Sequence, residues 1–122
     1  MNQRSLLFAQ FGVIAILVGF HLVAVINFLY WRMRWLDVPA HLLGGLWSGL
    51  FAAWILALLK IPPRIILCAG IALVFGVVWE SFEATTGITN FPADILDTLK
   101  DLSMSTLGGL MAFFLANKLV NS

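Results

Sequence analysis

Ionisable side chains in this sequence gather near one end of four long apolar stretches. A basic residue marks the other end of each stretch: Arg4, Lys60, Arg64 and Lys118. Counting 16 to 19 positions from these residues reaches His21, His41, Glu80 and Asp101. At a helical rise of roughly 1.5 Å per residue, each lies about 24–28 Å from the basic end. We therefore expect these four groups in one layer of a helical bundle.

Spacing within each stretch places the polar residues on one helix face. Asp37 and His41 are four residues apart, and Glu80 and Glu83 are three apart. The longest series, at intervals of three, four and four, is Asp94, Asp97, Asp101 and Ser105. Residues three and four apart share a face. Glycines extend these faces, and small residues let membrane helices approach closely, so we expect the polar stripes to face one another.

Converging carboxylates with an imidazole are suited to binding a metal ion. A charged group inside a membrane costs a few kcal/mol or more unless it is paired, so clustered acids must share protons or bind a cation. Oxygen ligands with an imidazole suit Mg²⁺, Mn²⁺, Fe²⁺ or Zn²⁺, and helix bundles commonly build such sites. We predict a divalent metal ion (Zn, Mn, Mg or Fe) as the cofactor. The predicted ligands are His41, Glu80, Glu83, Asp94, Asp97 and Asp101.

Four acids also have a structural interpretation. Asp37 lies two positions before a proline and is interpreted mainly as a helix cap. Asp94 falls in the first turn of a predicted helix, where the helix dipole favours an anion. Asp97 can pair with Lys100, although its polar stripe favours a function. Glu83 lies close enough to the interface to be solvated. Both interpretations stay open for Asp94 and Glu83.

The remaining polar residues divide more clearly. Glu80, Asp101 and His41 are hard to explain as surface groups, and we predict Glu80 and Asp101 to be catalytic. His21 stands alone on an apolar helix, where a hydrogen-bonded packing role is favoured over metal binding. Trp79, next to Glu80, is expected to border the site.

Composition identifies the elements that must position these residues. The chain has 122 residues, of which 61% are hydrophobic and 11% charged, and its mean hydropathy is +1.00. Apolar runs of 18 or more residues are typical of membrane helices. We predict an all-α fold with a single domain, residues 1–122, formed by an integral membrane bundle of four transmembrane helices. Their expected ranges are 5–31, 37–60, 64–85 and 92–118.

The last two helices constrain the depth of the site. Their uncharged stretches, residues 65–79 and 102–117, are 15 and 16 residues long, whereas about 20 are needed to span a bilayer. Either these helices fall short of spanning the bilayer, or Glu80 and Asp101 lie below the interface and complete the span; we favour the second interpretation. The excess of basic residues at the end that carries both termini predicts cytoplasmic termini and carboxylates toward the outer face.

Two segments carry a resemblance to known families. They are Asp37-x-x-x-His41-x-x-x-Gly45 and Trp79-Glu80…Asp94-x-x-Asp97-x-x-x-Asp101-x-x-x-Ser105-x-x-Gly108. Over about residues 35–110 the chain resembles the uncharacterised YjdF-like family of bacterial inner-membrane proteins and, more distantly, VanZ-like proteins. Ser105 stands where the YjdF-like pattern often has another acid, and Glu83 is the one acid that closely follows the Trp-Glu pair. The resemblance implies an intramembrane polar site and a bacterial inner-membrane location, but no reaction.

Several functions are excluded by what the sequence lacks. The net charge is +1 and no basic patch with interleaved aromatics occurs, so no nucleic-acid partner is expected. Two histidines are too few for a membrane di-iron desaturase. No serine nucleophile elbow is present.

Three functions remain. The first is a bundle that holds one divalent cation, or a close pair, and acts on a membrane lipid or another amphiphile. The metal would polarise a substrate oxygen or activate water, and a carboxylate would act as the base. The second is a small proton- or cation-coupled transporter, working as a homo-oligomer, in which Glu80 and Asp101 exchange protons. The third is an accessory subunit whose acidic face docks onto a partner in a membrane complex. Whether the protein is an enzyme stays open at this point.

Overall fold

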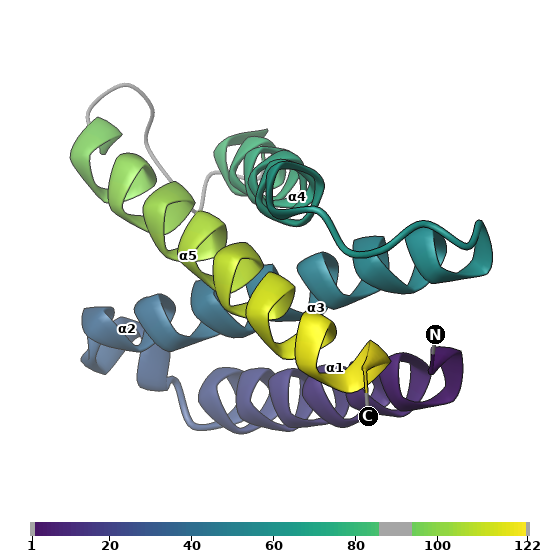
Figure 1. Ribbon diagram of the computed structural model, residues 1–122. Helices are drawn as coiled ribbons and strands as arrows, with labels where there is room; N and C mark the ends of the chain where they lie inside the picture. Colours follow the sequence, from purple (N-terminus) through teal and green to yellow (C-terminus); the bar gives the residue numbers. More distant parts are fainter. Residues whose placement is uncertain (1, 86–93, 122) are drawn as a thin grey trace.

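The computed structural model describes residues 2–85 and 94–121. These residues form helices and connecting turns, with no strand among them, which confirms the all-α prediction (Figure 1). The elements are α1 (Gln3–Ile26), α2 (Leu29–Arg32), a 3-10 turn η1 (Arg34–Leu36), α3 (Asp37–Leu58), α4 (Ile65–Thr85) and α5 (Ile95–Val120). The four long helices have 21 to 26 residues and are apolar enough to cross a membrane. At about 1.5 Å per residue, each exceeds the roughly 30 Å of a bilayer core.

The first helix ends earlier than predicted. It was expected to continue to residue 31, but α1 ends at Ile26. The Asn27 backbone N–H and the Asn27 side chain both donate to the Val23 carbonyl, at 3.1 and 2.9 Å. Phe28 then adopts a left-handed conformation, with φ of 55°, which cannot continue a right-handed helix. The chain turns there, and the short α2 brings Tyr30 back toward α1.

The other helix bounds differ by smaller amounts. Helix α3 ends at Leu58, before the predicted Lys60, because Lys60 adopts a left-handed φ of 61°. Helix α4 begins and ends within one residue of the prediction. The predicted start of the last helix at residue 92 lies outside the described residues; α5 runs from Ile95 to Val120, two residues beyond the predicted end.

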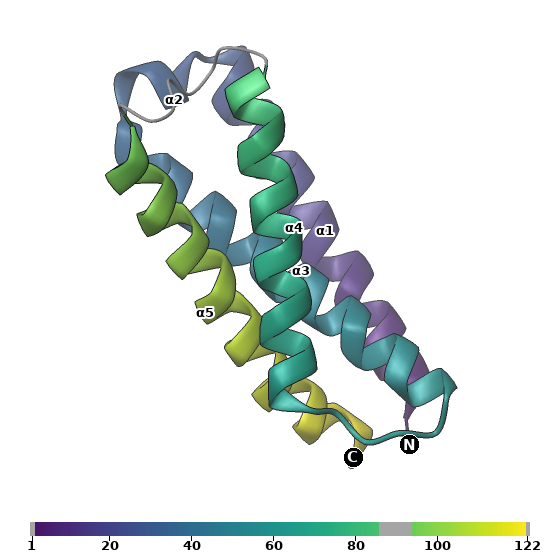
Figure 2. The ribbon, with the colours of Figure 1, turned by 90° about the horizontal axis from the view of Figure 1, so that it is seen from above.

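Helix α3 is the centre of the bundle and packs against α1, α4 and α5. Both termini lie at one end of the molecule, as Figure 2 shows. There the Gln3 side chain donates to the Ala57 carbonyl at 3.0 Å. The apolar core occupies this end and includes Leu6, Leu50, Ala53, Cys68, Ala112 and Val120. The polar residues predicted to share a layer lie toward the opposite end.

Glycines let α3, α4 and α5 approach closely. A Cβ atom on Gly45 would overlap the backbone carbonyl of Ser105, and one on Gly108 would overlap the Leu42 carbonyl. On α4, a Cβ on Gly76 would lie 3.1 Å from the Ser105 side chain. The expected packing of small residues between the polar stripes is confirmed. These contacts fix the depth at which side chains of the three helices meet.

Candidate metal centre

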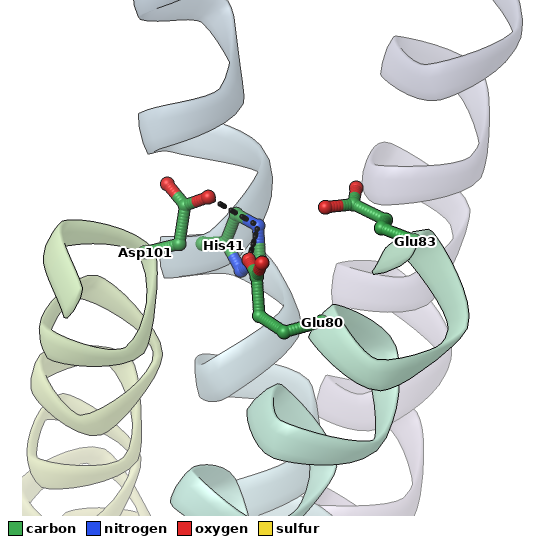
Figure 3. A group of neighbouring side chains, drawn as sticks. All are labelled: His41, Glu80, Glu83 and Asp101. Carbon is green, nitrogen blue, oxygen red and sulfur yellow. Dashed lines mark ion pairs between the residues drawn. The ribbon is translucent and has the colours of Figure 1, made fainter. Parts of the chain in front are cut away.

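Four buried side chains from three helices meet at the end of the bundle away from the termini. His41 comes from α3, Glu80 and Glu83 from α4, and Asp101 from α5, and Figure 3 shows them directed toward a common space. One potential ligand atom of each lies within 4.8 Å of those of the others. None of the four residues is more than 8% exposed. Residues far apart in sequence are thus brought together by the common depth of their helix positions.

The Nε2 atom of His41 lies at the centre of several carboxylates. It is 3.3 Å from Glu80 Oε1, 3.5 Å from Asp101 Oδ2 and 3.6 Å from Asp37 Oδ2. An imidazole nitrogen carries at most one hydrogen, so it cannot satisfy all three oxygens. Within the described part of the chain, His41 Nε2, Glu80 Oε1 and both Asp101 oxygens have no hydrogen-bond partner. Buried polar atoms are ordinarily paired, so these four atoms are available to a cation or to protons shared between the acids.

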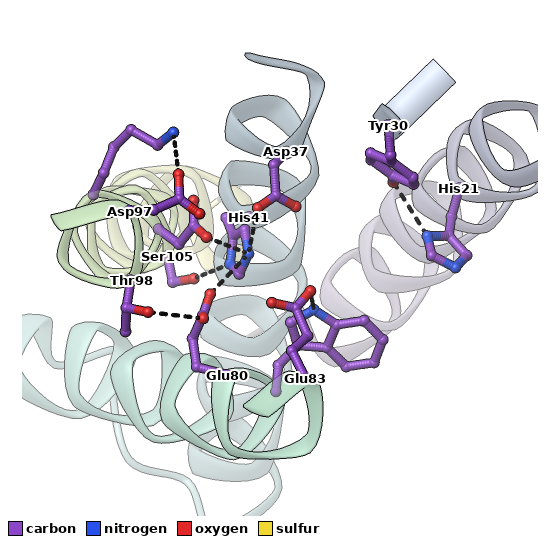
Figure 4. A network of polar contacts seen from close by, with 12 residues as sticks. His21, Tyr30, Asp37, His41, Glu80, Glu83, Asp97, Thr98 and Ser105 are labelled. Atoms are coloured by element: carbon purple, nitrogen blue, oxygen red, sulfur yellow. Dashed lines mark hydrogen bonds and ion pairs between the residues drawn. The ribbon is translucent and has the colours of Figure 1, made fainter. Parts of the chain in front are cut away.

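Hydrogen bonds on the outside of this group orient two of its side chains. The Nδ1 atom of His41 lies 3.3 Å from Ser105 Oγ, and Thr98 Oγ1 donates to Glu80 Oε2 at 3.4 Å (Figure 4). In both side chains the hydrogen-bonded atom faces away from the group, and His41 Nε2 and Glu80 Oε1 face into it. Partners of this kind orient the ligands of protein metal sites.

Trp79 borders the site, as predicted. Its Nε1 atom donates to Glu83 Oε1 at 2.9 Å. The indole ring also stands edge-on to the His21 imidazole, with ring centroids 6.4 Å apart. The prediction that Trp79 borders the site is therefore confirmed.

Asp37 was interpreted as a helix cap, and this interpretation is wrong. The cap position of α3 is Leu36, and no side-chain capping hydrogen bond is present there. Asp37 is the first residue of the helix and, four positions before His41, presents its carboxylate to that imidazole. It also belongs to a second group with Asp97 and Asp101, whose oxygens lie within 4.8 Å of one another. The four-residue spacing was the signal that could have identified it.

The two other acids of α5 take different positions. Asp97 pairs with Lys100 at 2.9 Å, which confirms the ion pair proposed from sequence, and it still belongs to the second group. Asp94 occupies the cap position of α5 and lies outside both groups. The geometry therefore gives no support to Asp94 as a ligand. Thr98 was not singled out from sequence, although it lies three positions before Asp101 on the same face.

His21 does not join the cluster. Its Nδ1 atom lies 3.1 Å from the Tyr30 hydroxyl, which confirms a hydrogen-bonded packing role (Figure 4). Burial raises the pKa of Tyr30, and the Asp37 and Glu83 carboxylates raise it further. Since the unperturbed phenol already titrates near 10, Tyr30 keeps its proton at neutral pH and can donate to His21.

The comparisons with known proteins identify a family. The profile of the family described as Predicted membrane protein (DUF2238) matches residues 5–122, nearly the whole chain. No curated protein and no solved structure matches the chain. The match is consistent with the resemblance to YjdF-like membrane proteins, and the four apolar helices agree with its description. The protein therefore belongs to the DUF2238 family of predicted membrane proteins.

Proposed function

We propose that this membrane protein binds a divalent metal ion between His41, Glu80, Glu83 and Asp101, and uses it to act on a lipid-like substrate. The observation that carries the proposal is the spacing of unpaired atoms around His41 Nε2. Glu80 Oε1 and Asp101 Oδ2 lie 3.3 and 3.5 Å from that nitrogen. Two ligands of one tetrahedral Zn²⁺, each about 2.1 Å from the metal, lie about 3.4 Å apart. The spacing thus suits ligands of a small cation, and it exceeds the roughly 2.7–3.2 Å of ordinary N–H···O hydrogen bonds.

The chemistry of the donors supports a transition metal or Mg²⁺. One imidazole nitrogen with several carboxylate oxygens is a set that Zn²⁺, Mn²⁺ and Fe²⁺ accept, and Mg²⁺ accepts the oxygens. Burial strengthens the case, because Asp101 is fully buried and carboxylates inside a membrane need compensation. A cation would compensate this charge without a basic partner at each acid.

Each residue of the site has a role in this proposal. When bound, the cation would polarise a phosphoryl or carbonyl oxygen or lower the pKa of a water molecule. Ser105 holds the His41 ring, and Thr98 holds Glu80. Glu80 and Asp101 are the proposed catalytic residues, because both carboxylates would hold the cation beside the reacting group, where Glu80 could also act as a base.

A groove between α4 and α5 supports an amphiphilic substrate. It has a volume of about 500 Å³ and is lined mainly by leucines, with Ser103 and Thr106. Because both helices are candidate spans, the natural occupant of this groove is an acyl chain of a membrane lipid. Two lining residues, Leu99 and Leu102, directly follow Thr98 and Asp101 in the sequence. A lipid tail in the groove would therefore place the polar end of its molecule at about the depth of the site.

We also propose an orientation in the membrane. The basic residues gather at the end that carries both termini, which favours cytoplasmic termini and a site toward the outer leaflet of the bacterial inner membrane. The packing of the first and last turns of the bundle in one apolar core supports the placement of both termini on the same side of the membrane.

Thermal unfolding in detergent tests metal binding. Wild-type protein treated with EDTA should unfold at a higher temperature after Mn²⁺ or Zn²⁺ is added back, because a ligand that binds the folded state stabilises it, by about 2.7 kcal/mol at 100 times Kd. The isosteric variant Glu80→Gln should lose most of this shift, whereas Asp94→Asn should keep it. An unchanged unfolding temperature in the wild type after metal addition would count against the proposal.

Reconstitution tests the substrate class. Protein in vesicles of phosphatidylethanolamine and phosphatidylglycerol, supplied with Mn²⁺, should convert a lipid component that mass spectrometry detects, and Asp101→Asn should not. Intact lipids together with pH-gradient-driven uptake of a solute, abolished by Glu80→Gln, would support the transporter instead.

A further inference from the structure

We infer that the protein holds a second divalent cation, bound by Asp37, Asp97 and Asp101, and that Asp101 bridges the two cations. This inference rests on the proposed function, because it adds a neighbour to the cation bound by His41, Glu80, Glu83 and Asp101. It changes the nature of the site from a single metal to a metal pair.

Asp101 carries the inference through its position. It is the residue that belongs to both groups of potential ligands. Within each group, the potential ligand atoms lie within 4.8 Å of one another. It is fully buried, and neither of its oxygens has a hydrogen-bond partner among the described residues. Its Oδ2 atom is the one 3.5 Å from His41 Nε2. A carboxylate that bridges two cations uses both oxygens, and this accounts for two buried unpaired oxygens on one side chain.

Asp37 shows that the two positions are adjacent. Its Oδ2 atom lies 3.6 Å from His41 Nε2, a ligand of the first cation, although Asp37 belongs to the second group. Two-metal sites in proteins have cations about 3.5–4 Å apart. Two groups that share one carboxylate and approach each other this closely suit such a pair.

The charge of the site favours two cations over one. The two groups together contain five carboxylates, from Asp37, Glu80, Glu83, Asp97 and Asp101. Among the described residues, the one lysine that forms an ion pair with any of these acids is Lys100, which pairs with Asp97. When all five acids are ionised, one divalent cation offsets less than half of their negative charge. A second offsets most of it, which lowers the cost of holding the acids near the membrane interior.

Titration of the purified full-length protein with Mn²⁺, followed by electron paramagnetic resonance, tests this inference. The wild type should bind two equivalents per chain, and the second should replace the six-line signal of isolated Mn²⁺ with the spectrum of an exchange-coupled pair. Asp97→Asn changes a half-exposed ligand of the second position alone, so it should bind one equivalent with an isolated signal. Asp94→Asn, on the same helix but outside both groups, should behave as the wild type does.

The outcomes separate this inference from the proposed function. Saturation of the wild type at one equivalent with an isolated signal would overturn the second cation and leave the first in place. Two equivalents without coupling, or an unchanged stoichiometry in Asp97→Asn, would overturn the bridge by Asp101 or the role of Asp97. No bound Mn²⁺ in the wild type would overturn both proposals together.

Discussion

His41 illustrates how neighbouring side chains determine which atom of a residue faces the site. Its Nδ1 atom lies beside Ser105 Oγ, so Nε2 is the nitrogen presented to the carboxylates. If Nδ1 carries the hydrogen and donates it to the serine, Nε2 keeps a lone pair for a cation, and the tautomer is set by the serine. The donation from Thr98 to Glu80 Oε2 similarly leaves Oε1 toward the site. Neutral hydroxyl groups thus orient the charged and imidazole ligands.

Removing the serine hydroxyl should weaken metal binding. Ser105→Ala takes away the partner of His41 Nδ1, and loss of such a partner typically reduces metal affinity about tenfold to a hundredfold. The Kd for Mn²⁺, measured by calorimetric titration, should rise accordingly. Ser103→Ala is the matched control, because Ser103 donates to the Leu99 carbonyl of its own helix and is exposed. Equal Kd values for the two variants would show that Ser105 does not position the ligand.

Much of the site could be predicted from the spacing of residues. The rest depended on which of two local roles or conformations a residue adopts. Similar distances from the basic ends predicted that His41, Glu80 and Asp101 would meet, because helical rise is nearly constant. Asp37 was misjudged because an acid at a helix start suits a cap as well as a ligand, and its four-residue spacing from His41 was given too little weight. The end of α1 before Phe28 could not be predicted, because no proline or glycine lies there in the sequence.

At the scale of the helices, the close crossing of α3 and α5 positions the site. Gly45 lies one turn after His41 and faces the backbone of Ser105, which lies one turn after Asp101. The contact that brings the helices together is therefore adjacent to the residues that form the site. A wider separation of the helices would move His41 and Asp101 apart as well as weaken the packing.

A methyl group at this crossing should destabilise the protein. The Cβ of Gly45→Ala would overlap the Ser105 carbonyl, and forced overpacking typically costs about 1–3 kcal/mol. We expect a lower unfolding temperature in detergent and weaker Mn²⁺ binding. Gly44→Ala is the matched control, because nothing lies within 4 Å of its Cβ position. If both variants unfold at the same temperature as the wild type, the crossing is not as close as described.

At the scale of the whole molecule, the bundle separates an apolar end from a polar end. The core of small and aliphatic residues lies at the end with both termini, and the buried acids come from the opposite ends of α4 and α5. Figure 2 shows those helix ends near α2. The exposed surface of the spanning helices is rich in large apolar side chains, which suits contact with lipid. One end thus provides most of the apolar packing and the other provides the candidate chemistry.

Labelling with a membrane-impermeant maleimide tests the proposed orientation. In a Cys68→Ala background, Trp35→Cys places a thiol at an exposed position at the polar end, and Asn121→Cys places one at the end with the termini. In intact bacterial cells the first variant should react and the second should be protected until the membrane is opened. The reverse pattern would place the site at the cytoplasmic face.

Elemental analysis of protein purified without chelators from metal-supplemented cells tests the central claim most directly. Asp101 belongs to both groups of potential ligands and is fully buried, so Asp101→Asn should lose most of the divalent metal that the wild type retains. Asp94→Asn, which makes the same substitution outside both groups, should keep the wild-type content. Wild-type protein without metal, or Asp101→Asn protein with the full amount, would contradict a metal site between these helices.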